Sequence, residues 1–143
     1  MENTYIPKKL FLYYWLPFVL WAAVIFLFSA SPTGRASEIH WKDFIIKKTA
    51  HLIEYSTFTV LLFRALIKSS VNKKKAAIIS VIIAMIYAFS DEFHQSFTPG
   101  REPKLRDVLI DISGSILTAL FIYRIAPKLS GKPKYLLKKL ELV

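Results

Sequence analysis

The sequence contains no cysteine, and this absence removes several kinds of chemistry. Disulfide bridges, thiolate metal sites and cysteine nucleophiles are excluded. No Gly-x-Ser-x-Gly elbow is present either, so nothing singles out Ser90, Ser96 or Ser113 as a nucleophile. Internal repeats, low-complexity tracts and domain linkers are also lacking. We therefore expect residues 1–143 to form a single domain.

Acidic residues are scarce, with 10 against 20 basic ones and a formal net charge of +10. The hydrophobic share is 54%, with a mean hydropathy of +0.39. Soluble domains are about 45–50% apolar even when glycine is counted. The lysines and arginines flank apolar segments, as they do in cytoplasmic loops of membrane proteins beside anionic lipid. The composition indicates a membrane protein and no nucleic-acid partner.

Long runs without charged residues predict the fold. Residues 10–34 contain no charged side chain, and about 20 apolar residues suffice to cross the hydrocarbon core. This run is long and has Pro17 inside it, so we interpret it as a retained helix and not as a signal peptide. The predicted spans cover residues 10–30, 49–67, 76–95 and 108–125, with a polar connection over 35–48. The fold class is an all-α integral membrane bundle of four transmembrane helices.

Local signals predict the start of the fourth span and the conformation of the C-terminal tail. Asp107 precedes the fourth apolar run, and a carboxylate at a helix N-terminus accepts its free N–H groups, so Asp107 is predicted to cap that helix. The basic tail over residues 128–143 is predicted to form a short amphipathic helix at the membrane interface. Its interleaved apolar residues are Tyr135, Leu136, Leu137, Leu140 and Leu142.

The distribution of basic residues predicts the orientation. The side that carries both termini and the 64–75 connection holds 13 of the 20 lysines and arginines, and the opposite side holds seven, including Arg35. The positive-inside bias therefore predicts cytoplasmic termini in a multi-pass protein of a cell membrane. The polar connections at the other end of the bundle would then face outward.

Ionisable residues recur near the outward helix ends. Lys48, His51 and Glu54 are three residues apart, and Tyr55 is four from His51, so they share one helix face. Asp107, Asp111 and Gly114 line one face of the fourth span, where glycine permits close helix approach. The third span ends in Asp91, Glu92 and Gln95, and Arg101 and Arg106 follow. We expect these residues to form one polar pocket that is open to the outer leaflet.

Two roles are assigned within this pocket. Histidine beside carboxylates suits proton transfer, and arginine suits bidentate phosphate binding. Candidate catalytic residues are His51, Glu54, Asp91, Glu92 and Asp107. Candidate substrate-binding residues are Lys48, Tyr55, Gln95, Arg101, Arg106 and Asp111.

Alternatives remain open at this point. The charges of Asp91 and Glu92 can pair with Arg101 or Arg106 and only hold the spans together. Asp91, Glu92, Asp107 and Asp111, with His51 or His94, can instead form an oxygen-rich divalent-cation site, although no dedicated metal motif is present. Catalysis, a metal requirement and the oligomeric state are not decided by the sequence. Transport is less favoured, since the inner halves of the spans offer few polar groups.

The order of these residues resembles the VanZ-like family of small bacterial membrane proteins. The resemblance is carried by Lys48-x-x-His51-x-x-Glu54-Tyr55, by Asp91-Glu92-x-x-Gln95 with Pro99-Gly100-Arg101, and by Asp107-x-x-x-Asp111-x-x-Gly114. It covers roughly residues 21–123. The family pattern more often has Asn where Asp111 stands and Gly where Thr118 stands.

The resemblance implies an integral protein of the bacterial cell membrane. The best-known member of the family raises resistance to teicoplanin and related lipoglycopeptides, and no reaction is securely attached to the family. The sequence and the resemblance together predict binding or modification of an anionic envelope component, either a phospholipid headgroup or a lipid-linked cell-wall precursor. Reduced susceptibility to teicoplanin is a candidate phenotype.

Overall fold

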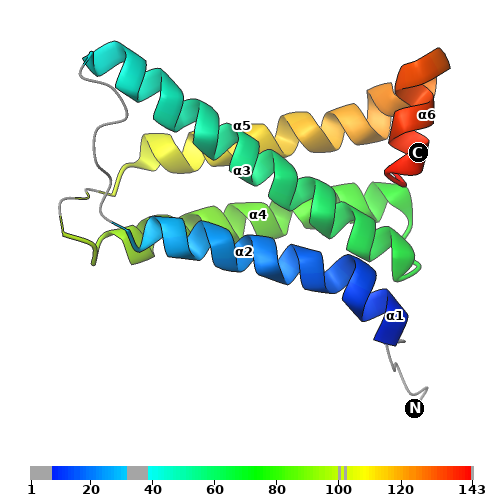
Figure 1. Ribbon diagram of the computed structural model, residues 1–143, viewed down its shortest axis with the longest axis horizontal. Helices are drawn as coiled ribbons and strands as arrows, with labels where there is room; N and C mark the ends of the chain where they lie inside the picture. The colour runs from blue at the N-terminus through cyan, green and yellow to red at the C-terminus, as the bar shows by residue number, and fades with distance from the viewer. Residues whose placement is uncertain (1–7, 32–38, 100, 102, 143) are drawn as a thin grey trace.

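A computed structural model describes residues 8–31, 39–99, 101 and 103–142 (Figure 1). Arg35 and Gly100, which belong to the orientation argument and the motif above, lie outside the described residues. The described part is helical and contains no strand. Its elements in chain order are α1 (Lys8–Leu10), η1 (Phe11–Trp15), α2 (Leu16–Ser29), α3 (His40–Lys68), α4 (Lys73–Gln95), α5 (Leu105–Leu120), η2 (Phe121–Ile125), η3 (Ala126–Lys128) and α6 (Gly131–Lys139).

Four continuous helical segments are long and apolar enough to cross a membrane. They comprise Lys8–Ser29, His40–Lys68, Lys73–Gln95 and Leu105–Lys128. The predicted all-α architecture with four spans is confirmed. Helix α3 packs against α2, α4 and α5, and α4 likewise packs against α2, α3 and α5 (Figure 1).

Each of the two π-helical turns lies just before a proline. Phe11–Trp15 precedes Pro17, and Phe121–Ile125 precedes Pro127. Proline has no N–H, and its ring crowds the carbonyl four residues earlier, so the regular bonding pattern cannot continue there. A wider π turn before Pro17 lets the first span continue past this point, whereas at Pro127 the chain forms a 3₁₀ turn and the helix ends at Lys128. Pro17 is therefore compatible with the first span.

Helix α3 begins at His40, so the predicted polar connection over 35–48 is wrong from residue 40 onward. Hydropathy identifies the part of a helix that can lie in lipid. It does not show whether the helix continues beyond the membrane into water. Nζ of Lys47 lies 2.9 Å from Oδ2 of Asp43, one helical turn away, and such pairs stabilise exposed helix. The N-terminal end of α3 projects past the other helices in Figure 1.

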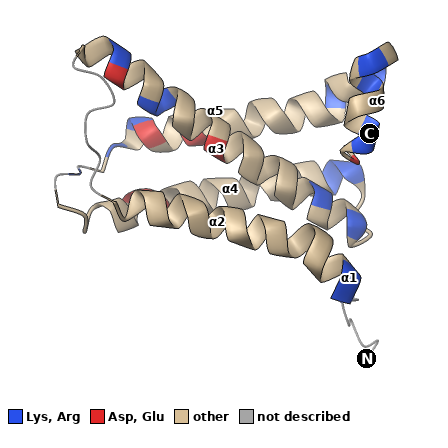
Figure 2. Ribbon diagram, in the orientation of Figure 1, with Lys and Arg blue, Asp and Glu red and all other residues tan. Residues whose placement is uncertain are grey.

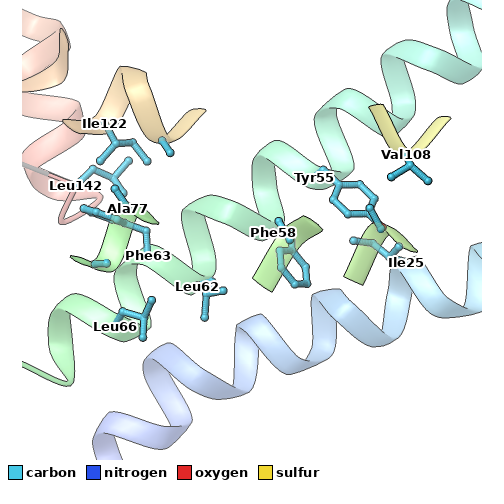
Figure 3. Close-up of a cluster of buried hydrophobic side chains, with 14 residues drawn as sticks. Ile25, Tyr55, Phe58, Leu62, Phe63, Leu66, Ala77, Val108, Ile122 and Leu142 are labelled. Atoms are coloured by element: carbon cyan, nitrogen blue, oxygen red, sulfur yellow. The ribbon is translucent and has the colours of Figure 1, made fainter. Parts of the chain in front are cut away.

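Aromatic residues of α3 meet small residues of α4 in the core. Tyr55, Phe58 and Phe63 are at most 1% exposed and project from α3 between the other helices (Figure 3). The buried face of α4 carries Ala76, Ala77, Ser80, Ala84 and Ala88. Small side chains let helices approach closely in a bilayer, where van der Waals packing holds a bundle together.

The C-terminal segment folds back onto the bundle end that carries the termini. Helix α6 lies within the predicted tail, and Tyr135, Leu136 and Leu140 are exposed as expected of an interfacial helix. Leu142, however, is only 4% exposed and lies in the core beside Ile122 (Figure 3). The tail is thus partly a packing element of the bundle.

Glu141 fastens this segment through charge. Its carboxylate lies 2.6 Å from Nζ of Lys68 and 3.3 Å from Nη2 of Arg64, and it accepts a hydrogen bond of 3.0 Å from the Tyr14 hydroxyl. The hydrogen bond from Lys68 holds the pKa of Glu141 below its usual range. Glu141 therefore stays ionised at neutral pH and joins the first two spans to the tail.

Charge is divided between the two ends of the bundle (Figure 2). Lys and Arg gather around the end that carries the termini. Among the described residues, Glu141 is the acidic residue at this end. Most other acidic residues lie toward the opposite end, as the sequence pattern predicts. The candidate site therefore lies at the end opposite the termini.

Candidate functional site

Two ion pairs join α3 to α5. Nζ of Lys48 lies 2.6 Å from Oδ2 of Asp107, and Nδ1 of His51 lies 3.1 Å from Oδ1 of Asp111. The spacing of three residues on α3 thus matches the spacing of four on α5, since both equal about one helical turn. An ionised carboxylate only accepts, so Nδ1 of His51 is the donor to it, and Nε2 remains as the second ring nitrogen. Lys48 and His51 on α3, and Asp107 and Asp111 on α5, thus share the helix faces that the sequence pattern predicts.

Close helix contact one turn further along α5 sets this register. A Cβ atom on Gly114 would lie 2.9 Å from the backbone oxygen of Leu52. The Ser56 hydroxyl donates to the Gly114 carbonyl at 3.4 Å, and Thr59 donates to Ser115 at 2.8 Å. Gly114 therefore lets α5 approach α3 closely enough for both ion pairs to form.

The end of α4 contributes three buried polar side chains. The amide nitrogen of Gln95 donates to Oδ2 of Asp91 at 2.9 Å. Oε2 of Glu92 accepts the backbone N–H of Lys104, the N-cap residue of α5, at 2.6 Å. Asp107 was predicted to cap this helix, and that prediction is wrong. The helix begins at Leu105, so Asp107 lies inside the first turn and pairs with Lys48. The N–H group at the start of α5 is instead bonded by Glu92, which belongs to α4.

Arg101 holds the α4–α5 connection against α2. Its guanidinium donates to the Gln95 side-chain oxygen at 2.9 Å, to the Phe28 carbonyl at 2.9 Å and to the Ser31 carbonyl at 3.0 Å. No direct ion pair joins Arg101 to Asp91 or Glu92 in the described residues. The predicted joint phosphate clamp of Arg101 and Arg106 is not assembled, because Arg101 is occupied by protein acceptors.

Arg106 occupies a different environment from Arg101. Its guanidinium lies 4.8 Å from the centre of the Phe44 ring, and its side chain is 57% exposed. Nε of Arg106 lies 3.6 Å from Oδ1 of Asp107, which is beyond hydrogen-bond distance. Arg106 and the partly exposed Lys48 are thus the cations at the rim of the cluster.

Glu54 and Tyr55 face the same carboxylates from α3. The half-buried Glu54 interacts electrostatically with His51, Asp111, Asp91 and Arg101. Tyr55 is fully buried and interacts with Asp91, Asp111 and Glu54. We call the group the polar cluster. Its members are Lys48, His51, Glu54, Tyr55, Asp91, Glu92, Gln95, Asp107 and Asp111.

Several buried oxygens of the polar cluster have no hydrogen-bond partner. They are the Tyr55 hydroxyl, Oδ1 of Asp91, Oε1 of Glu92, Oδ1 of Asp107 and Oδ2 of Asp111. All five residues are buried, with at most 9% of their surface exposed. More than about nine in ten buried polar groups in proteins are hydrogen-bonded, so five exceptions in one cluster call for an explanation. A cluster that served packing alone would be expected to pair these atoms.

The other candidate residues have different surroundings. The His94 ring stacks on Phe26 with a centroid separation of 4.1 Å, and its Nδ1 is buried without a hydrogen-bond partner. Ser90, Ser96 and Ser113 each donate to a carbonyl of their own helix, so none is arranged as a nucleophile. The described residues contain no group of three or more His, Cys, Asp or Glu side chains that could hold a metal ion. The divalent-cation alternative therefore gains no support.

One neighbour of the cluster, Ser29, was not predicted from the sequence. Ser29 at the end of α2 is 3% exposed, and its hydroxyl donates to the backbone oxygen of Asp91 at 3.4 Å. Its own carbonyl accepts the Thr98 hydroxyl at 3.4 Å. The sequence gives little signal for this role, because a serine within a helix most often bonds to its own backbone.

Comparisons with known proteins give one match. The family model described as VanZ/LLP1 matches residues 9–126 of the chain. This range contains every residue of the polar cluster. No curated protein and no solved structure matches the chain.

Proposed function

The chain belongs to the VanZ/LLP1 family, and from this premise we propose that its polar cluster is an outward-facing binding site for the headgroup of an envelope lipid. The candidate ligands are a phospholipid and a lipid-linked cell-wall precursor. The observation that carries the proposal is the set of five buried, unpartnered oxygens at one end of a membrane bundle. Polar groups are expensive within a bilayer and mark functional sites by default. Lys48 and Arg106 at the rim suit the headgroup phosphate.

Acid–base chemistry on the bound headgroup is the second candidate function. The pairing of His51 Nδ1 with Asp111 supports it, because a carboxylate orients the imidazole and leaves Nε2 for proton transfer. Glu54, Asp91, Glu92 and Asp107 are the further proton carriers in this form of the proposal. For the cell, we propose lowered susceptibility to teicoplanin-type lipoglycopeptides as the consequence.

The proposal requires that the cluster face away from the cytoplasm, with both termini inside a bacterial cell. The chain has no cysteine, so single-cysteine variants can be labelled without background. We expect Leu105→Cys to react with a membrane-impermeant maleimide on intact cells, and Tyr135→Cys to react only after lysis. Both side chains are exposed, at 65% and 69%. The reverse labelling pattern would refute the orientation and the proposed function with it.

Substitutions that remove one polar group each test the function. We expect His51→Ala, Glu92→Gln and Asp107→Asn to lower lipid retention by about tenfold, which corresponds to the loss of one or two charge-assisted hydrogen bonds. Retention is measured by native mass spectrometry on protein from nanodiscs that contain anionic phospholipid or lipid-linked precursor. Teicoplanin susceptibility of expressing cells is measured in parallel.

Protein abundance separates this proposal from a purely structural role. Because His51→Ala is also expected to destabilise the fold, the comparison rests on Glu92→Gln and Asp107→Asn. For these two variants, loss of lipid retention at wild-type abundance supports binding, whereas loss of retention in proportion to abundance shows that the charges serve packing. Ser113→Ala is the matched control, because Ser113 is exposed and its hydroxyl bonds to its own helix. This control is expected to behave as wild type.

A further inference from the structure

The balance of charge in the polar cluster is acidic. Carboxyl groups of Glu54, Asp91, Glu92, Asp107 and Asp111 interact electrostatically with one another. The basic side chains within or against the cluster are Lys48, His51, Arg101 and Arg106. Lys48 and His51 each contact one carboxyl group, Arg106 lies 3.6 Å from Asp107, and Arg101 donates to an amide oxygen and backbone carbonyls. Carboxyl groups therefore outnumber the basic side chains, and hydrogen-bond acceptors are in excess.

The unpartnered atoms have the same character. Oδ1 of Asp91, Oε1 of Glu92, Oδ1 of Asp107 and Oδ2 of Asp111 are carboxyl oxygens, which accept hydrogen bonds when ionised. The Tyr55 hydroxyl is a separate observation, because Tyr55 belongs to the aromatic core and is 0% exposed, yet its oxygen meets the carboxylates without a partner. A phenol oxygen both accepts and donates. These atoms lack a donor with a positive charge.

We propose that the polar cluster binds a primary ammonium group carried by an envelope lipid. This inference rests on the proposed function and names the ligand chemistry of the same site. A primary ammonium offers three N–H donors and one positive charge, which match the acceptor excess. A phosphate placed among the carboxylates would add to the negative charge, so the lipid phosphate is held at the rim by Lys48 and Arg106. The ligand thus combines an ammonium with a nearby phosphate.

The test compares lipids that differ in the nitrogen. The protein is reconstituted in phosphatidylcholine nanodiscs that contain a minor share of phosphatidylethanolamine or phosphatidylglycerol, and retained lipid is identified by native mass spectrometry. All three lipids carry the phosphate, but only phosphatidylethanolamine has ammonium N–H donors. We expect about tenfold preferential retention of phosphatidylethanolamine, because charge-assisted hydrogen bonds are lost with either of the other two.

A second arm distinguishes the source of the amine. A lipid-linked cell-wall precursor with a free peptide amine is compared with the same precursor after acetylation of that amine. Retention of the free-amine precursor in preference to phosphatidylethanolamine assigns the ammonium to the precursor. Equal retention of the free and acetylated precursors, together with no preference for phosphatidylethanolamine, overturns the inference.

Variants connect the preference to the cluster. Asp91→Asn and Asp111→Asn remove charge at constant shape, and Tyr55→Phe removes one unpartnered oxygen while keeping the ring contacts with Phe58 and Tyr87. Each is expected to reduce the preference at least about threefold, with an unchanged melting temperature for Tyr55→Phe. Asp43→Asn is the matched control, because Asp43 is an acid outside the cluster that pairs with Lys47.

The outcomes separate the two proposals. If all phosphate lipids are retained equally and Lys48→Met reduces this retention, ammonium recognition is refuted and headgroup binding is supported. Lipid retention by the wild type that is no greater than that of the Glu92→Gln variant refutes both proposals. An ammonium preference that survives Asp91→Asn, Asp111→Asn and Tyr55→Phe refutes the assignment to this cluster.

Discussion

Replacing Gly114 with leucine is expected to separate α5 from α3 and to abolish the folded bundle. The Cβ atom of any larger residue would lie 2.9 Å from the backbone oxygen of Leu52, and backbone cannot rotate away as a side chain can. Gly114→Ala is expected to cost about 1–3 kcal/mol, the range found for overpacked cores. Thermal unfolding of the purified protein in detergent measures both effects.

The adjacent position on the same helix supplies the control for Gly114. Ser113→Ala changes an exposed residue and is expected to melt with the wild type. A Gly114→Leu protein that also melted with the wild type would contradict the close contact between α3 and α5. Because this contact sets the register of the ion pairs, lipid retention is expected to fall together with stability in the Gly114→Ala protein.

Breaking the His51–Asp111 pair is expected to produce the second large effect. Asp111 is fully buried, and removing one partner of a buried ion pair costs about 3–5 kcal/mol, because the other charge is left without compensation. We therefore expect His51→Ala and Asp111→Ala each to lower the melting temperature strongly. The double substitution is expected to cost less than the sum, with a coupling of about 1–3 kcal/mol.

Asp111→Asn separates the hydrogen bond from the charge. The asparagine side-chain oxygen can still accept from Nδ1 of His51, so most of the stability is expected to remain. Additive effects of the single substitutions in the double-mutant cycle would show that the 3.1 Å contact contributes nothing. Loss of stability in Asp111→Asn equal to that in Asp111→Ala would show that charge alone matters.

Local patterns predicted which residues share a helix face but not the partners of those residues. The spacing of Lys48 and His51, and of Asp107 and Asp111, placed each pair on one helix face, and the structure joins the two faces residue by residue. The cap of α5 could not be predicted in this way, since a side chain from another helix competes with the local carboxylate. Glu92 is twelve residues from the N–H that it accepts.

The contacts of Arg101 and Leu142 also could not be predicted from the local sequence. From the sequence, an arginine after two acidic residues is expected to pair with a carboxylate or a phosphate. The guanidinium of Arg101 instead donates to the backbone carbonyls of Phe28 and Ser31 and to the side-chain amide of Gln95. Leu142 continues the apolar pattern of an interfacial helix, and only the reversal of the chain at Glu141, where φ is 59°, carries it into the core. Both outcomes depend on contacts across many residues.

The sequence by itself determined that this is a four-helix membrane protein with ionisable residues gathered near one end of its spans. Hydrophobic length and charge-free runs are local properties, and the bilayer imposes the same requirement on every helix that crosses it. Tertiary structure alone decided which carboxylates are neutralised, which helix end Glu92 caps and which oxygens stay without a partner. The physical reason is that hydrogen bonds and ion pairs act over about 3 Å, so their partners are fixed only when the helices have packed.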